Sequence, residues 1–146
     1  MAAADRPRVF LDTNVLVSAL YSADGPPGAI LRLHVDERIT IVVSQLVLDE
    51  LIRAIRRKLP DTLPALRTFL VNAPPQVVPD PAAADLDRLG GAVNPDDAPV
   101  LAAAVNAGAD YLVSGDVAFL REARRLETSV ALVTPRELLG RLQSGS

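Results

Sequence analysis

Residues 8–20 read RVFLDTNVLVSAL, with one acidic residue, Asp12, between two apolar runs. The run at 8–11 is short and rich in β-formers, so it predicts a buried strand. The run at 15–20 continues as a helix. Burying a carboxylate without a partner is unfavourable. Asp12 at this junction therefore needs a structural or a chemical reason.

The composition is that of one compact domain without disulfides. The chain has 146 residues, of which 49% are hydrophobic and 3% aromatic. This length suffices to bury a core made mostly of aliphatic side chains, and the hydrophobic fraction argues against disorder. The absence of cysteine excludes a disulfide framework, zinc thiolate sites and thiol catalysis, and it fits a reducing compartment.

The charge and the apolar runs narrow the class of protein further. A net charge of −3 argues against a simple basic nucleic-acid binder. No apolar run approaches the length of about 18 residues that would predict a membrane span. The segment MAAADRPRV at 1–9 lacks the apolar stretch of a signal peptide. We therefore expect a cytoplasmic protein that does not associate with membranes.

Strand and helix patterns alternate along the chain. The apolar, β-branched runs predict strands at 8–11, 39–43, 75–79, 110–115 and 129–133. Helical spacing predicts helices at 15–20, 29–35, 45–59, 62–72, 99–107 and 117–125, with a weak helical turn or two at 82–89. The segment ADGPPG at 23–28 is typical of a turn.

Three local signals fix helix ends. Ser44 is a favourable N-cap for the helix that Pro60 ends. Gly108 is expected to close the helix that begins near Pro99. The sequence Thr-Pro-Arg-Glu at 134–137 has the form of a capping box with proline at the first helical position.

Alternating strands and helices indicate an α/β fold. Crossover connections of this kind build a parallel sheet with helices on both faces, and strands that are apolar on both sides agree with it. We expect a central, mostly parallel sheet of four to five strands. The domain should span 1–146, with flexible ends at 1–7 and 142–146.

Four acidic residues are predicted at one edge of this sheet. In open α/β sheets, functional groups gather beyond the carboxyl ends of the strands. Asp12 ends the first strand, and Asp116 follows a later one. Asp97 begins the helix before that later strand, and Glu50 lies on the helix after the second strand.

Each acid also has a structural interpretation. Asp12 could cap the next helix, and Asp97 or its neighbour Asp96 could be an N-cap. Asp116 follows a glycine and could be a turn residue.

Glu50 lies opposite the apolar stripe of its helix, near Arg53 and Arg57, where a solvated ion pair is the default. The four acids together are more informative than each alone, because converging carboxylates repel one another. A bound hard cation such as Mg²⁺, which prefers oxygen ligands, would compensate that repulsion.

Four segments together resemble the PIN domain and, within it, the VapC-like toxin components of bacterial toxin–antitoxin pairs. They are FLDTNVLVSAL, SQLVLDEL, DDAPVLAAAVNAGADYLVSGD and VTPRELL, which begin at Phe10, Ser44, Asp96 and Val133. The likeness runs from about residue 8 to 140. It implies the three-layer PIN-like fold and a metal-dependent endoribonuclease that uses Mg²⁺ or Mn²⁺.

The resemblance also implies roles for single residues. By motif match, the catalytic and metal-binding acids are Asp12, Glu50, Asp97 and Asp116. The small polar residues that orient the acids and the metal waters correspond to Thr13, Asn14 and Ser114. One departure concerns the position two residues past the fourth acid, where relatives often carry another acid and this chain has Ala118.

Substrate and partners follow from the same resemblance. The substrate is RNA, whose backbone Arg53 and Arg57 could guide, although a basic run on a helix is more often a solvated face. A cognate antitoxin and a homodimer are implied. The only histidine, His34, lies within the helix at 29–35 and is interpreted as a surface or packing residue.

Three alternatives stay open at this point. The chain could be an RNA-processing PIN nuclease without an antitoxin, or a non-catalytic module that binds RNA or protein. A phosphatase or phosphotransfer domain would usually need a second aspartate near the first, and Asp12-Thr13-Asn14 does not supply it.

Overall fold

The computed structural model describes residues 6–144 and has a parallel five-stranded sheet at its centre. The spatial order of the strands is β3-β2-β1-β4-β5, and every neighbouring pair is parallel. The strands are β1 (Arg8–Leu11), β2 (Thr40–Ser44), β3 (Gln76–Val78), β4 (Tyr111–Val113) and β5 (Ala131–Val133). The predicted α/β class with a parallel sheet is confirmed.

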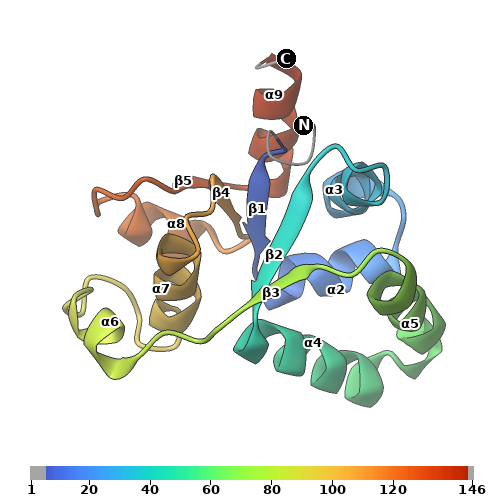
Figure 1. Cartoon of the computed structure of the whole chain (residues 1–146), viewed down its shortest axis with the longest axis horizontal. Helices are drawn as coiled ribbons and strands as arrows, with labels where there is room; N and C mark the ends of the chain where they lie inside the picture. Colours follow the sequence, from blue (N-terminus) through green and yellow to red (C-terminus); the bar gives the residue numbers. More distant parts are fainter. Residues whose placement is uncertain (1–5, 145–146) are drawn as a thin grey trace.

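Helices flank the sheet on both sides (Figure 1). They are α2 (Thr13–Tyr21), α3 (Gly25–Val35), α4 (Gln45–Lys58), α5 (Leu63–Asn72), α6 (Ala83–Asp87), α7 (Ala98–Asn106), α8 (Val117–Ala123) and α9 (Pro135–Ser144), with a 3₁₀ turn, η1 (Pro60–Thr62), before α5. In Figure 1, α2, α3, α4 and α5 lie to the right of the central strands, and α6, α7 and α8 lie to the left. This is the expected three-layer arrangement.

The connectivity reverses direction at β1. The chain moves outward from β1 to β2 and β3, then returns to place β4 on the other side of β1. Leu11 is in register with Val113, so both strands end at the same level. In open α/β sheets, the crevice at such a switch point is where ligands bind.

The central strands are apolar on both faces because both faces are covered. Val9, Phe10 and Leu11 of β1 are fully buried, as are Ile41 and Val42 of β2. These residues belong to a continuous hydrophobic core. Continuous apolar runs are typical of parallel strands buried between helices.

Most of the predicted helix ends are confirmed. The Ser44 hydroxyl accepts a hydrogen bond from the Val47 N–H at 3.2 Å. Both bonds of the capping box form, since Thr134 N–H donates to Glu137 Oε1 at 2.8 Å and Glu137 N–H donates to Thr134 Oγ1 at 3.1 Å. Gly108 has a φ of +65° after α7, a left-handed conformation that favours glycine.

The turn predicted at 23–28 is wrong in part. Helix α3 already begins at Gly25, because Pro26 and Pro27 occupy its first turn, where proline's missing N–H is not needed. Gly28 is buried there, and a Cβ at this position would lie 2.3 Å from the Ala23 carbonyl oxygen. The glycine and prolines therefore start a helix instead of interrupting the chain.

The ends of the chain are described only in part. Residues 142–144, expected within a flexible end, belong to α9. Pro7 accepts a backbone hydrogen bond from Thr40 at 2.9 Å. The rest of that expectation, on 1–5 and 145–146, lies outside the described residues. Over residues 6–144, no helix is both long and apolar enough to cross a membrane.

His34 is a packing residue, as predicted. Its Nδ1 accepts a hydrogen bond from the Ile41 N–H at 3.0 Å, and its Nε2 lies 2.8 Å from the Ala73 carbonyl oxygen. The ring also meets Phe69 edge-on, with ring centres 5.8 Å apart. An acceptor Nδ1 requires the proton on Nε2, so the imidazole connects α3, β2 and the end of α5.

Candidate functional site

Asp12 stands where β1 ends and α2 begins. Its N–H still continues the sheet by donating to the Val113 carbonyl at 3.2 Å. Its carboxylate caps α2 by accepting from the Val15 N–H at 3.0 Å, so it is held in one orientation. Burial raises the pKa of Asp12, and the charge of Asp116 adds to the rise, while hydrogen bonds from Ser114 and Val15 oppose it.

Ser114 joins the first and fourth acids. It is fully buried directly after β4. Its hydroxyl bonds the Asp12 carboxylate and accepts from the Asp116 N–H at 3.0 Å. The Asp116 carboxylate caps α8 by accepting from the Phe119 N–H at 3.1 Å. Asp116 is therefore a helix cap at the switch point, and the turn interpretation alone does not describe it.

Asp97 occupies the N-cap position of α7, but its side chain makes no capping hydrogen bond. It is half-buried, whereas its neighbour Asp96 is exposed. Burial is the largest cause that raises the pKa of Asp97. The charges of Asp116, Asp96, Glu122 and Asp12 follow in that order. The carboxylate of Asp97 is thus free of a capping role and lies within the electrostatic reach of several other acids.

Glu50 comes to the same place from α4. It is half-buried, and the Thr13 hydroxyl donates to its Oε1 at 3.3 Å. Within residues 6–144, Glu50 forms no ion pair with Arg53 or Arg57. The solvated Glu–Arg pair is therefore not formed, and the described partner of Glu50 is the residue after Asp12.

An open depression of about 390 Å³ connects these residues. Its walls are formed by Asp12, Thr13, Asn14, Glu50, Arg53, Ala54, Arg57, Lys58, Asp96, Asp97 and Val100. Asp116 is not part of the walls, and it acts on the site through its charge on Asp12 and Asp97. The structure thus brings three of the four predicted acids into one depression and places the fourth beside it.

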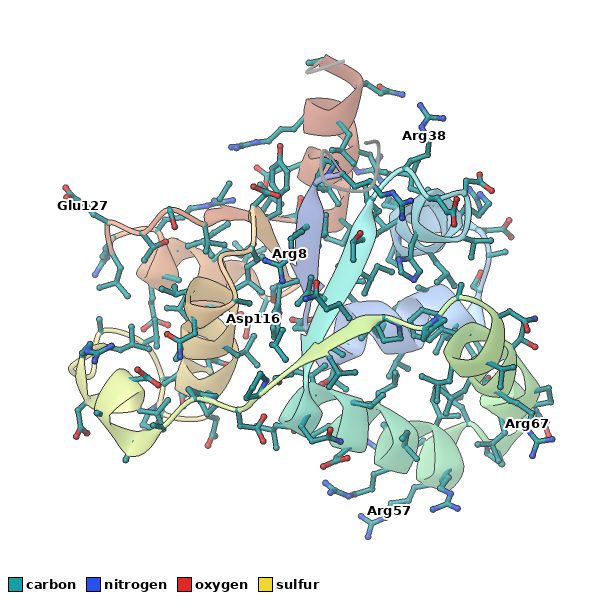
Figure 2. The ribbon with its side chains drawn as sticks, viewed as in Figure 1. Arg8, Arg38, Arg57, Arg67, Asp116 and Glu127 are labelled. Atoms are coloured by element: carbon teal, nitrogen blue, oxygen red, sulfur yellow. The ribbon has the colours of Figure 1, made fainter. Side chains whose placement is uncertain are left out.

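Basic side chains border one side of this depression. Arg53, Arg57 and Lys58 are exposed along the polar face of α4. The opposite face of α4 packs into the core through Leu51 and Ile55. Figure 2 shows Arg57 extending from α4 into solvent, while Asp116 lies beside the central strands. An acidic floor with a basic border can bind a phosphodiester and a cation together.

The chemistry of the donor atoms, although not their spacing in this structure, suits a hard divalent cation. All candidate ligands are carboxylate oxygens, which Mg²⁺ and Mn²⁺ prefer. Two of the carboxylates have raised pKa values because burial and like charges disfavour their ionised form. In the described part of the chain, no three acidic or histidine side chains are already grouped closely enough to hold a metal ion.

Sequence reasoning found the edge of the sheet but missed two neighbours of the site. Asp96 lines the depression beside Asp97, whereas its sequence position predicts only a helix cap. Glu122 on α8 is the second neighbour, because its charge raises the pKa of Asp97. Its spacing of six residues after Asp116 matches no simple motif, so only the fold reveals it.

Comparison of the sequence with known protein families identifies the family of this chain. The PIN domain family matches residues 8–118, which contain β1 to β4 and all four acids. The chain therefore belongs to the PIN domain family. No curated protein sequence matches the chain.

Solved structures share this fold at low sequence identity. VapBC2 from Rickettsia felis, bound to a promoter DNA fragment, is 21% identical with a TM-score of 0.62, over 87% of this chain and 98% of that one. DNA-bound VapBC from Salmonella typhimurium is 20% identical with a TM-score of 0.62, over 88% and 98%. FitAcB from Neisseria gonorrhoeae is 18% identical with a TM-score of 0.62, over 88% and 98%.

Proposed function

We propose that the protein is a metal-dependent endoribonuclease that hydrolyses RNA phosphodiester bonds. The observation that carries the proposal is the depression at the switch point of a PIN domain, where Asp12, Glu50 and Asp97 lie together. Asp116 completes the proposed catalytic set from its edge. The arrangement has more carboxylates than cations nearby, which is a charge distribution that suits Mg²⁺ or Mn²⁺.

The residues of the chain hold and orient this site. The cation would be held by the four acids, and it supplies Lewis acidity that activates water and stabilises negative charge on the phosphoryl oxygens. The cap on α2 and the Ser114 hydroxyl fix Asp12. The Thr13 hydroxyl fixes Glu50, which we propose orients the attacking water. Asn14 lines the depression, and we propose that it helps to orient the acids and the metal-bound waters.

The basic border favours RNA as the substrate. Arg53 and Arg57 can donate several N–H groups to phosphate oxygens next to the acids. The net charge of −3 makes the rest of the surface a poor polyanion binder, so binding should be local. We propose unpaired RNA, because its bases are accessible for reading outside a duplex.

We further propose that the protein is the toxin of a type II toxin–antitoxin pair, acts as a homodimer and is inhibited by an antitoxin protein. VapBC structures from two bacteria share its fold over nearly their whole length. An antitoxin that closes the depression would place a basic side chain among the acids. Because charge complementarity favours association, the repelling carboxylates suit such a partner.

Cleavage of single-stranded and looped RNA with Mg²⁺, Mn²⁺ or excess chelator tests the nuclease proposal. We expect cleavage with metal and none with chelator. RNA that is cut at the same rate in excess chelator would contradict the metal mechanism. Purification from a host deleted for contaminating RNases, beside an Asp12→Asn preparation, controls for carried-over activity.

Co-expression with the product of an adjacent small reading frame tests the toxin proposal separately. We expect a stable complex with suppressed cleavage, and a growth defect when the chain is expressed alone. Active nuclease with neither a neighbouring partner nor a growth defect would instead favour an RNA-processing enzyme.

A further inference from the structure

Helix α4 carries a second depression, of about 390 Å³, beside the depression that contains the acids. Its walls are formed by Asp49, Ile52, Arg53, Arg56 and Arg57, which recur at helical spacing on one face of α4. Arg53 and Arg57 also line the acidic depression, so the two depressions share a wall. Arg56 is the arginine of α4 that lines the second depression without lining the first.

The positive charge of this surface is not compensated by acids of the same helix. Arg53, Arg56 and Arg57 are exposed, and within residues 6–144 they form no ion pair. Asp49 stands four residues before Arg53, a spacing that favours an ion pair on a helix. Its Oδ1 instead accepts a hydrogen bond from Gln45 Nε2 at 2.9 Å. The helix dipole favours bases in the last turn of α4, but its partial charge leaves the guanidinium donors available to an anion.

A nucleic-acid strand is the anion that fits two adjoining depressions. Guanidinium groups bind phosphate oxygens through several N–H donors. A single phosphate would occupy one depression, whereas a strand carries a charge on every nucleotide and can occupy both. A second copy of the chain is disfavoured here, because a two-fold contact would place the arginines of both copies against one another. The net charge of −3 makes attraction of a polyanion a property of this surface and not of the whole protein.

We propose that the second depression is a further phosphate-binding subsite for RNA, at least one nucleotide away from the phosphate that is cut. Arg56 binds the backbone there, and Arg53 and Arg57 connect this subsite with the acidic depression. Arg56 is thus a substrate-binding residue that does not touch the reacting phosphate. RNA that is cut at the acids must extend far enough on one side to use the subsite. This inference rests on the proposed ribonuclease function.

Cleavage kinetics of Arg56→Ala test the inference, with Arg38→Ala as the matched control. Arg38 is also an exposed arginine, and it lies at the opposite end of the molecule from Arg57 (Figure 2). With a long single-stranded RNA, we expect Arg56→Ala to raise KM by about fivefold and to leave kcat nearly unchanged, because an exposed contact away from the reacting phosphate contributes modest binding only. Arg38→Ala should change neither constant.

The salt dependence of RNA affinity tests for a phosphate contact directly. Fluorescence anisotropy with a labelled single-stranded RNA measures it in an Asp12→Asn background, where the RNA stays intact. Arg56→Ala should make the slope of log affinity against log salt shallower by about 0.7, the value for one phosphate of a single strand. Arg56→Lys keeps the charge and should restore the slope, which a purely structural role would not explain.

Shortened RNAs separate the remaining outcomes. When RNA is trimmed stepwise on the 5′ or the 3′ side of the cleavage site, the effect of Arg56→Ala on KM should disappear once one side no longer reaches the second depression. If the wild type cuts RNA but Arg56→Ala behaves like it, or shows the same defect at every RNA length, only this inference is wrong. If the wild type does not cut RNA, the proposed function fails and this inference fails with it. Melting curves confirm that each variant is folded.

Discussion

At two strand-to-helix junctions of the same sheet, the surroundings shift the pKa of an acidic residue in opposite directions. At the edge, between β5 and α9, Glu137 accepts from the Thr134 N–H and pairs with Arg124 at 2.9 Å. Those contacts lower the pKa of Glu137. At the centre, between β1 and α2, burial and the nearby Asp116 raise the pKa of Asp12 despite its capping bond.

The two pKa shifts show which ionised carboxylate stabilises the folded chain and which one destabilises it. An acid with a lowered pKa is more favourable ionised in the folded chain than in the unfolded one, and a raised pKa means the reverse. Glu137 therefore supports its junction. Asp12 is kept at the switch point although its charge opposes folding, as expected where a group serves binding or catalysis.

Asp12→Asn is expected to have the largest effect on activity. The change keeps the size and the capping ability of the side chain but removes the charge that would hold the cation. RNA cleavage should fall by about 100-fold or more, because metal-derived stabilisation of the transition state amounts to several kcal/mol and each 1.36 kcal/mol is about tenfold. Single-turnover cleavage rates measure it.

Glu137→Gln is the matched control at the edge of the sheet. It removes the same charge from the corresponding kind of junction and should leave cleavage unchanged. An Asp12→Asn enzyme with near wild-type turnover would remove Asp12 from the proposed site, and the capping role would then be its whole function.

Asp96 and Asp97 are neighbours in sequence, so replacing each in turn compares a half-buried and an exposed acid at the same helix start. Asp97 is half-buried and makes no capping bond, whereas Asp96 is exposed at the rim. Asp97→Asn should reduce cleavage by about 10- to 100-fold, in line with the loss of one metal-supporting group. Asp96→Asn should stay within about threefold, because an exposed charge is screened. Equal losses, or a larger loss at Asp96, would reverse the assignment.

Asp116→Asn separates stability from function at the central junction. Asparagine still caps α8, but the repulsion with Asp12 and Asp97 is removed. The variant should therefore melt above the wild type in chelator. Mg²⁺ at ten times Kd should stabilise the wild type by about 1.4 kcal/mol, and the variant by less. Thermal melts across a Mg²⁺ series test both statements.

Identical midpoints in chelator and identical responses to Mg²⁺ would contradict a shared cluster. Asp116 would then be a helix cap with no further role. Because Asp116 is exposed, its contribution to repulsion is reduced by solvent, so the shift in chelator should be smaller than the shift on adding metal.

The fold was largely predictable because its signals are local. Apolar runs gave the strands, and caps such as Ser44 and Thr134 gave helix starts to within a residue or two. Pro26 and Pro27 misled the prediction, since the same residues suit a turn and the first turn of a helix. The order of the strands in the sheet could not be predicted, because no local pattern indicates which strands lie next to β1.

The candidate site was predictable only where the end of a strand identifies it. Asp12 and Asp116 follow strands, so parallel register alone brings them to one edge. The bond from Thr13 to Glu50 depends on how α4 crosses α2, which periodicity does not give. The charge of Glu122 raises the pKa of Asp97 from a separate helix, and an acid on a helix gives no sequence signal of such an effect.

The smallest expected effect is the pH dependence of stability, which should have opposite signs at the two junctions. The pKa of Asp12 is raised above 3.8 in the folded chain. The free energy of unfolding of the wild type therefore falls as the pH rises from 3.8 through the pKa that Asp12 has in the folded chain. Asp12→Asn removes this pH-dependent loss of stability. In chelator the variant should therefore be no more stable than the wild type below pH 3.8 and more stable at pH 7.

The lowered pKa of Glu137 stabilises the folded chain above pH 4.5. This stabilisation is lost as the pH falls through the pKa that Glu137 has in the folded chain. Glu137→Gln should therefore be less stable at pH 7, by about 0.5 kcal/mol or less since the pair is exposed and screened, and equal to wild type in acid. Urea unfolding from pH 3 to 8 measures both curves; two differences of the same sign would mean that the central acid is as well compensated as the edge one.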